Sequence, residues 1–239
     1  MVKLIGFQTS PWTEKARWAL DARHIEYDYE EYVPLISEPA LRLRVRKSRV
    51  TVPTLLQPTG KPLMDSYDIA RWAQRNGGGE TLFPEHLHTK IAHINAQSEQ
   101  ILHILRAHFT HNLLNHPEAK KEQLPPFIPK PLYGMANLGL WYISQKYALE
   151  KLSKQALHQQ IEPTLTRWQT LKGDKDTIFD QWSYADIIVA STLNFIKPHA
   201  TRSSGPASDE CQTIDSLAEQ FEDMLRWRDE VYAKHRIKP

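Results

Sequence analysis

Two residue pairs that lie near each other in the sequence, Val52-Pro53 and Asp65-Ser66, have the chemistry to hold a peptide-like anion. The bond before a proline is the one place where a cis peptide is common, and a cis bond would turn the N–H and C=O of Val52 outward. An acid followed by serine is typical of a helix start, where free N–H groups and the positive end of the helix dipole attract an anion. We therefore expect a binding site for a peptide-like ligand within residues 51–73.

The elements that must position these pairs form a short alternating pattern. The hydrophobic periodicity, with the breaks at Gly and Pro, predicts the order βαβ-α-ββα for residues 1–78. The predicted elements are strand 2–7, helix 12–22, a strand around Tyr27 and Tyr29, a short irregular helix within 37–50, strands 54–57 and 63–65, and helix 66–75. Residues 37–50 are ambiguous, because Leu41, Leu43 and Val45 alternate with arginines as they would in a strand.

After this first unit the pattern becomes purely helical. We predict a linker at residues 79–88, which follows a run of glycines, and an all-helical domain at residues 89–239. Ser183 and Asp186 form a capping box that starts an almost entirely apolar helix, typical of a buried central helix. The proline-rich stretch 117–131 and the polar stretch 197–213 are predicted to be loops.

The composition favours an ordinary globular protein of the cytoplasm. The 239 residues carry a net charge of +2, which is too small to indicate a nucleic-acid partner, and no apolar run is long enough to span a membrane. The single cysteine, Cys211, excludes an internal disulfide and a C-x-x-C redox pair. Seven histidines lie between His86 and His116, but no cysteine or acid pair supports them, so we expect no metal site.

Three motifs, taken with this order of elements, resemble the soluble glutathione transferase family. They are V-P-T-L at Val52 with D-S at Asp65, the stretch S-P-W-T-E-K-A-R-W-A-L at Ser10, and the S-x-x-D box at Ser183. The resemblance covers nearly the whole chain. It implies a thioredoxin-like N-terminal domain that binds glutathione, followed by an all-helical domain that holds a hydrophobic acceptor.

The resemblance also implies roles for individual residues. Val52 would pair its backbone with the cysteinyl part of glutathione, just before a cis Pro53. Asp65 and Ser66 would hold the γ-glutamyl amine and carboxylate, with the Ser66 N–H on the carboxylate, and Ser10 would face the sulfur. Residues 47–51 depart from the family's usual asparagine-proline-x-glycine-lysine sequence, so no contact to the glycyl end is assigned. The family implies a homodimer and no cofactor beyond glutathione as cosubstrate.

Ser10 has the chemistry that this role requires. A free thiol is only a few per cent thiolate at neutral pH, and the thiolate is the nucleophile. A hydroxyl that donates to a charged acceptor contributes about 1.5–3 kcal/mol, enough to lower a thiol pKa by about one to two units. Two alternatives remain: Ser10 as a helix N-cap and nothing more, or Thr9 or Thr13 as the donor.

The expected activity is the addition of glutathione to hydrophobic electrophiles, or the reduction of peroxides by glutathione. Family members with cysteine at the position of Ser10 reduce disulfides, so serine favours conjugation. The alternative is a non-catalytic binding or interaction module on the same fold. Several aromatic side chains are candidates for the acceptor pocket, although aromatic residues at helical spacing more often form core: Trp12, Phe109, Tyr133, Trp141 and Tyr142.

Overall fold

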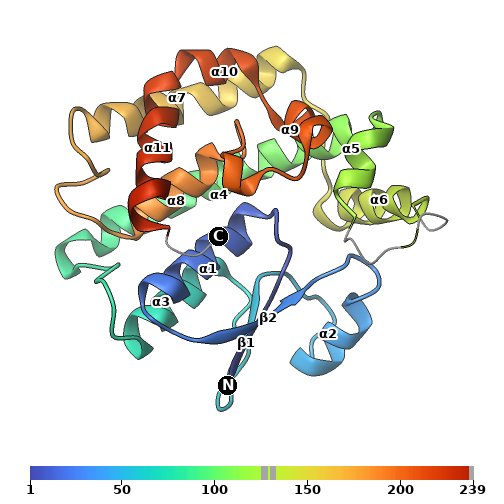
Figure 1. Ribbon diagram of the computed structural model, residues 1–239, viewed down its shortest axis with the longest axis horizontal. Coiled ribbons are helices and arrows are strands. Elements are labelled where there is room, and N and C mark those ends of the chain that lie inside the picture. Colours follow the sequence, from blue (N-terminus) through green and yellow to red (C-terminus); the bar gives the residue numbers. More distant parts are fainter. Residues whose placement is uncertain (125–128, 130–132, 237–239) are drawn as a thin grey trace.

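The computed structural model describes residues 1–124, 129 and 133–236. A small sheet with its helices makes up the N-terminal part, and a larger set of helices packs on one side of it (Figure 1). The sequence expectation of a thioredoxin-like domain followed by a helical domain is confirmed. The boundaries at residues 78 and 89 stay a prediction.

The sheet has three strands in the order β2-β1-β3. Strand β1 (Val2–Gly6) lies between β2 (Tyr27–Glu31), which is parallel to it, and β3 (Thr54–Leu56), which is antiparallel. The fourth strand predicted at 63–65 is reduced to an isolated bridge between Leu55 and Leu63, with N···O distances of 2.7 and 3.0 Å. Pro62 has no N–H to extend the ladder, and Asp65 already caps the next helix.

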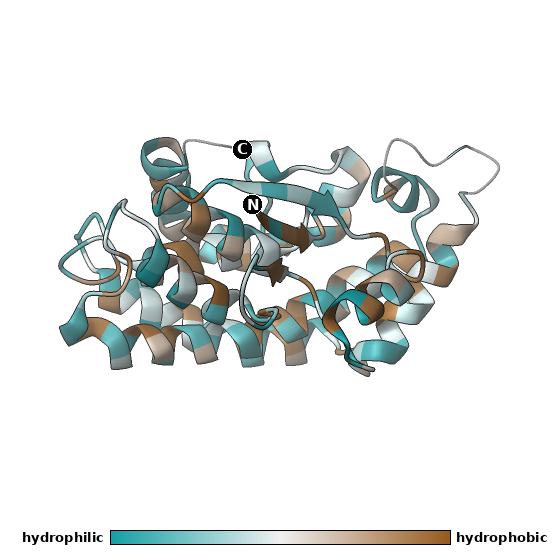
Figure 2. Ribbon diagram, turned by 90° about the horizontal axis from the view of Figure 1, so that it is seen from below, coloured by the Kyte–Doolittle hydropathy of each residue, from teal (hydrophilic) through white to brown (hydrophobic). Residues whose placement is uncertain are grey.

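Helices cover both faces of the sheet. Helices α1 (Pro11–Ala22) and α3 (Ser66–Asn76) enclose one apolar cluster with Leu4 and Leu55. Helix α2 (Glu38–Val45) covers the opposite face through Leu41 and Val45, which confirms a short helix in the ambiguous stretch. Figure 2 shows β1 in hydrophobic colour beside the N-terminus, whereas β2 is largely hydrophilic.

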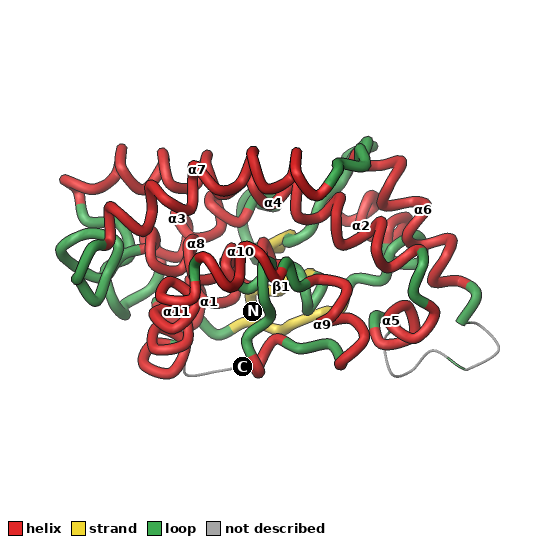
Figure 3. The backbone as a smooth tube through the Cα atoms, turned by 90° about the horizontal axis from the view of Figure 1, so that it is seen from above, coloured by secondary structure: helices red, strands yellow, loops and turns green. Residues whose placement is uncertain are grey.

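The helical domain surrounds one fully buried helix, α8 (Tyr184–Leu193). The Ser183 N–H donates to Asp186 Oδ2 at 2.8 Å, as the capping box predicts. In Figure 3 the strands lie in the middle and helices enclose them. The other helices are α4 (His88–Leu114), α5 (Pro117–Glu122), α6 (Met135–Tyr147), α7 (Lys154–Lys172), α9 (Pro206–Gln212), α10 (Asp215–Gln220) and α11 (Glu222–His235), with 3-10 turns at Glu85–Leu87 and Ala200–Arg202.

The two loop predictions are wrong in part. The stretch 117–131 begins with α5, and residues 125–128 and 130–132 lie outside the described residues. The stretch 197–213 contains α9, whose first N–H groups are capped by Glu122: its carboxylate accepts from Ala207 at 3.3 Å and from Ser208 at 2.7 Å. This cap comes from a helix about 85 residues earlier, so local sequence did not reveal it.

Hydrogen bonds and salt bridges join the helical domain to the linker and to the N-terminal domain. The Tyr184 N–H donates to Leu82 O at 2.7 Å, and its hydroxyl donates to Ser66 O at 3.2 Å. At the other end of the chain, Arg236 forms salt bridges with Glu14 and Asp21 on α1. Within the described residues, no helix is long and apolar enough to cross a membrane.

Candidate active site

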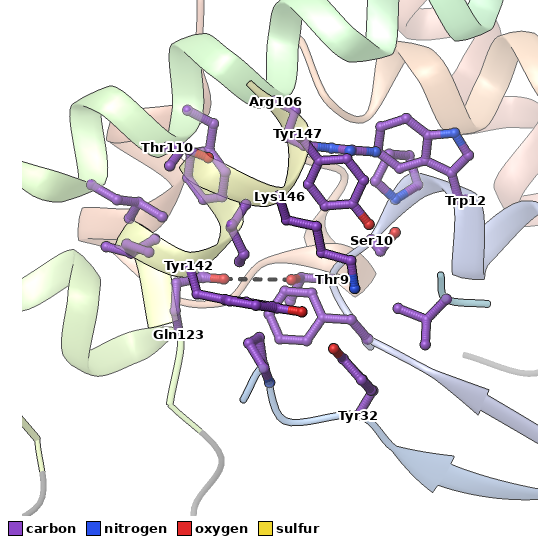
Figure 4. Close-up of a pocket in the computed structure, with 18 of the residues that line it drawn as sticks. Thr9, Ser10, Trp12, Tyr32, Arg106, Thr110, Gln123, Tyr142, Lys146 and Tyr147 are labelled. Carbon is purple, nitrogen blue, oxygen red and sulfur yellow. Dashed lines mark hydrogen bonds between the residues drawn. The ribbon is translucent and has the colours of Figure 1, made fainter. Parts of the chain in front are cut away.

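A cavity of about 140 Å³ lies between the two domains. The N-terminal domain lines it with Thr9, Ser10 and Val52, and the helical domain lines it from α4 and α6 (Figure 4). The structure therefore brings Ser10 and Val52 together, although 42 residues separate them in sequence. Pro53, Asp65 and Ser66 do not line this cavity.

Ser10 occupies the N-cap position of α1. Its backbone is extended (φ −73°, ψ 129°), its N–H donates to Phe7 O at 2.9 Å, and its C=O accepts from Glu14 N at 3.0 Å. Its side chain makes no capping hydrogen bond, and the residue is half-buried. The Ser10 hydroxyl is therefore held at a helix start with its hydrogen available to a ligand.

The neighbouring threonines are engaged elsewhere. Thr9 Oγ1 lies 3.4 Å from Gln123 Oε1 and donates to it. Thr13 is fully buried, and its Oγ1 accepts from the Phe7 N–H at 3.2 Å. Of the three hydroxyls weighed from sequence, that of Ser10 is the one without a hydrogen bond among the residues that the structure describes.

The Val52–Pro53 peptide bond is cis, as the sequence suggested. The ladder between β3 and β1 begins only at Thr54, so the Val52 backbone lies outside it. Two hydrogen bonds hold the backbone around this peptide bond: Thr51 Oγ1 donates to Met64 O at 2.8 Å, and Thr54 Oγ1 donates to Thr51 O at 2.6 Å.

Asp65 is the N-cap of α3. Its Oδ1 accepts from the N–H groups of Tyr67, at 2.8 Å, and Asp68, at 3.1 Å. Ser66 is only 1% exposed, and its Oγ has no hydrogen-bond partner among the described residues. Since Asp65 already satisfies the next N–H groups, Ser66 holds the unused donors of this helix start.

A second carboxylate, that of Glu99 on α4, lies near this helix start. It accepts from Trp12 Nε1 at 2.7 Å and from the fully buried Lys15 Nζ at 2.8 Å. Partial burial raises the pKa of Asp65, and the negative charges of Glu99 and Asp68 add to the increase. The carboxylates of Asp65, Asp68 and Glu99 thus lie near one another, an arrangement that suits an ammonium group.

The aromatic side chains that the sequence suggested for the acceptor pocket fall into two groups. Trp12, Phe109 and Tyr142 line the cavity, whereas Trp141 is 56% exposed and neither it nor Tyr133 lines it. Helical spacing alone could not separate these roles, because the cavity depends on how α6 packs against α4.

Sequence reasoning missed two cations of the cavity wall, Arg106 and Lys146. Lys146 Nζ lies 2.9 Å from Glu38 Oε2 on α2, so this salt bridge joins the two domains beside the cavity. Glu38 also accepts from the Tyr32 hydroxyl. Burial alone would raise the pKa of Glu38, but the hydrogen bonds from Tyr32 and Lys146 outweigh it and lower the pKa to about 2. No local motif marks either cation.

No group of three or more His, Cys, Asp or Glu side chains that could hold a metal occurs in the part of the chain that the structure describes.

Comparison with known sequences identifies the N-terminal region. Residues 4–81 match the family model described as glutathione S-transferase, N-terminal domain. A "probable glutathione S-transferase" of Nicotiana tabacum is 31% identical over 84 residues, which are 35% of this chain and 37% of the tobacco protein. The chain thus spans little more than a third of the length of the curated relatives it matches.

Solved structures extend the likeness to the whole fold. A glutathione S-transferase from Methylobacterium radiotolerans, in complex with glutathione sulfonate, is similar over 98% of this chain and 91% of its own, with a TM-score of 0.61 and 15% identity. A beta-etherase from Sphingobium sp. is similar over 98% and 95%, with a TM-score of 0.66 and 15% identity. At such identities the likeness shows the fold. Residues 4–81 therefore match a glutathione S-transferase N-terminal domain, and the described structure has the fold of these solved structures.

Proposed function

We propose that this protein is a glutathione transferase of the serine type, which adds glutathione to hydrophobic electrophiles. The observation that carries the proposal is the free hydroxyl of Ser10, held at a helix N-terminus in the wall of a cavity between the domains. A hydroxyl and a helix dipole in that place would both favour a thiolate.

The binding half of the site supports glutathione as the cosubstrate. The Val52 backbone, next to a cis proline and outside the ladder, offers groups for a peptide to pair with. The unused donors of Ser66 suit a carboxylate, and the acidic corner of Asp65 and Glu99 suits the α-amine of the γ-glutamyl group. The Methylobacterium structure with glutathione sulfonate is consistent with such a ligand on this fold.

The test is the variant Ser10→Ala. We expect it to lower kcat/KM for conjugation of 1-chloro-2,4-dinitrobenzene about 10- to 100-fold, because one hydrogen bond to a charged sulfur is lost. The apparent pKa of the bound thiol, read from the pH–rate profile, should rise. Affinity for S-methylglutathione, measured by calorimetry, should change little, because this ligand has no thiol to stabilise.

Thr9→Ala is the matched control, since it removes a neighbouring hydroxyl that already donates to Gln123. It should cost less activity than Ser10→Ala. A larger loss in Thr9→Ala would mean that Thr9 is the donor. Glutathione binding without turnover in the unaltered protein would favour a non-catalytic module on the same fold.

The proposal extends to reduction of peroxides by glutathione, which needs the same thiolate. A cytoplasmic location and a homodimer follow from the resemblance to the family. Sedimentation of the purified protein, which should give about twice the 27.7 kDa of one chain, checks the dimer.

A further inference from the structure

The acceptor side of the cavity contains a cation without a counter-ion. Arg106, on α4, lines the cavity, and its Nη1 is buried without a hydrogen-bond partner. No carboxylate in residues 1–124 or 133–236 forms a salt bridge with it. Residues 125–132 include no acidic residue, so that segment has no carboxylate side chain to offer.

Two aromatic rings hold the guanidinium in place. Its Cζ lies 3.8 Å from the centroid of the Trp12 ring and 4.0 Å from that of the Tyr147 ring. Figure 4 shows Arg106 beside these rings, on the same side of the cavity as Ser10. The π faces of the rings attract the cation but accept none of its N–H groups as a carboxylate would, so these groups can still bind an anionic ligand.

The nearby charges do not neutralise Arg106. Glu99 is already engaged by Lys15 and Trp12. Burial lowers the pKa of Arg106, although the charge of Glu99 opposes this. A buried charge without a partner is unfavourable, so an anion that enters the cavity would gain more here than at an exposed arginine.

The other cation of the cavity provides a contrast. Lys146 is only 10% exposed and is paired with Glu38. Its charge is already compensated within the protein, whereas that of Arg106 is not. The difference assigns the anion-binding role to Arg106.

We propose that the electrophile taken by this site carries an anionic group, such as a carboxylate, on an aromatic body, and that Arg106 binds that group. This inference rests on the proposed function, because it names the class of acceptor that the same site would use in the conjugation reaction. The apolar wall from Phe109 and Leu140 would receive the aromatic body.

The first experiment compares 4-chloro-3,5-dinitrobenzoate with its methyl ester. In both, the glutathione thiolate forms a C–S bond to the ring carbon and chloride leaves with the bonding pair. We expect the unaltered protein to have a KM for the carboxylate about 10-fold or more below that for the ester. Arg106→Met should remove this preference, whereas Arg106→Lys should retain part of it. Lys146→Met should leave the preference in place.

The glycyl carboxylate of glutathione is the other anion that Arg106 could bind. The same variants distinguish it from the carboxylate of the acceptor. If Arg106 binds the acceptor, Arg106→Met leaves the KM for glutathione within about twofold. A rise in that KM with an unchanged preference for the carboxylate acceptor would overturn the proposal. Equal KM values of the unaltered protein for the carboxylate and the methyl ester would also overturn the proposal. This comparison uses no variant, so it does not depend on whether a variant folds.

A binding measurement separates this proposal from the proposed function. Calorimetric titration with 3,5-dinitrobenzoate and its methyl ester needs no turnover, because neither has a leaving group. Tighter binding of the acid that is lost in Arg106→Met supports the anion site even in a protein that conjugates nothing. Equal binding of acid and ester overturns the anion site even if Ser10 proves to be catalytic.

Discussion

In our proposal Asp65 has two roles, one in the structure of a helix and one in binding. Its carboxylate caps α3 through the N–H groups of Tyr67 and Asp68, and in our proposal it also faces the α-amine of glutathione. The capping role needs an oxygen acceptor, whereas the binding role needs a negative charge. Two substitutions can therefore separate them.

We predict that Asp65→Asn raises the KM for glutathione about 5- to 20-fold with little change in stability, because the cap oxygen remains while the charge is lost. Asp65→Ala should raise KM similarly and also lower the free energy of unfolding by about 1 kcal/mol. Steady-state kinetics and urea unfolding measure the two effects. If only Asp65→Ala changes KM, then Asp65 acts through the helix cap alone.

At the scale of the elements, the start of α8 depends on the buried side chain of Asp186. Asp186 accepts from the Ile178 N–H at 2.7 Å and from the Ser183 N–H at 2.8 Å, and it is fully buried. Burial raises the pKa of Asp186 to about 6, against the lowering effect of these hydrogen bonds. The ordinary value of 3.8 applies in the unfolded chain, so the folded state binds the proton more tightly.

This predicts a pH dependence of stability with a defined sign. Protonation of Asp186 contributes about 3 kcal/mol to the free energy of unfolding. This contribution is fully present below about pH 4 and is lost as the pH rises through about 6. Asp186→Asn cannot titrate there. The free energy of unfolding of the unaltered protein, minus that of Asp186→Asn, should therefore fall between pH 4 and pH 7. A constant difference over this range would contradict the prediction.

At the scale of the whole molecule, a buried charge network ties the C-terminus to the first helix. Glu14 is 1% exposed and lies 2.9 Å from Arg236 and 3.2 Å from Arg202. Burial alone would raise the pKa of Glu14, but the two arginines outweigh it and lower the pKa. The cavity lies between the two domains, so a network that holds the domains together also maintains the site.

We predict that Arg236→Met lowers the free energy of unfolding by about 3 kcal/mol, because it leaves Glu14 with less compensation. Adding Glu14→Gln should recover part of that loss, which a double-mutant cycle by urea unfolding would measure. Since the pKa of Glu14 is lowered, its contribution to stability is present at neutral pH and is lost as the pH falls below about 4.5. Additive single effects would show that the pair is not coupled.

The sequence by itself determined the thioredoxin-like order of elements, the helix starts at Ser10 and Asp65, the cis-proline candidate at Val52-Pro53 and the capping box at Ser183. These features are local: each depends on a few neighbouring residues whose backbone preferences and hydrogen bonds agree. The tertiary structure alone decided three other features: α9 in a predicted loop, the hydrogen bond of Thr9 to Gln123, and the cavity between the domains. Each of these rests on a partner far away in the sequence.

Arg106 shows the physical reason most clearly. In the sequence it is one arginine on a long helix, with nothing to set it apart. Only the packing of α4 against α1 and α6 places it between Trp12 and Tyr147, with no salt-bridge partner among the residues that the structure describes. Burial and charge pairing are properties of the assembled fold, so the sequence could suggest glutathione, whereas our proposal for the class of acceptor needed the tertiary structure.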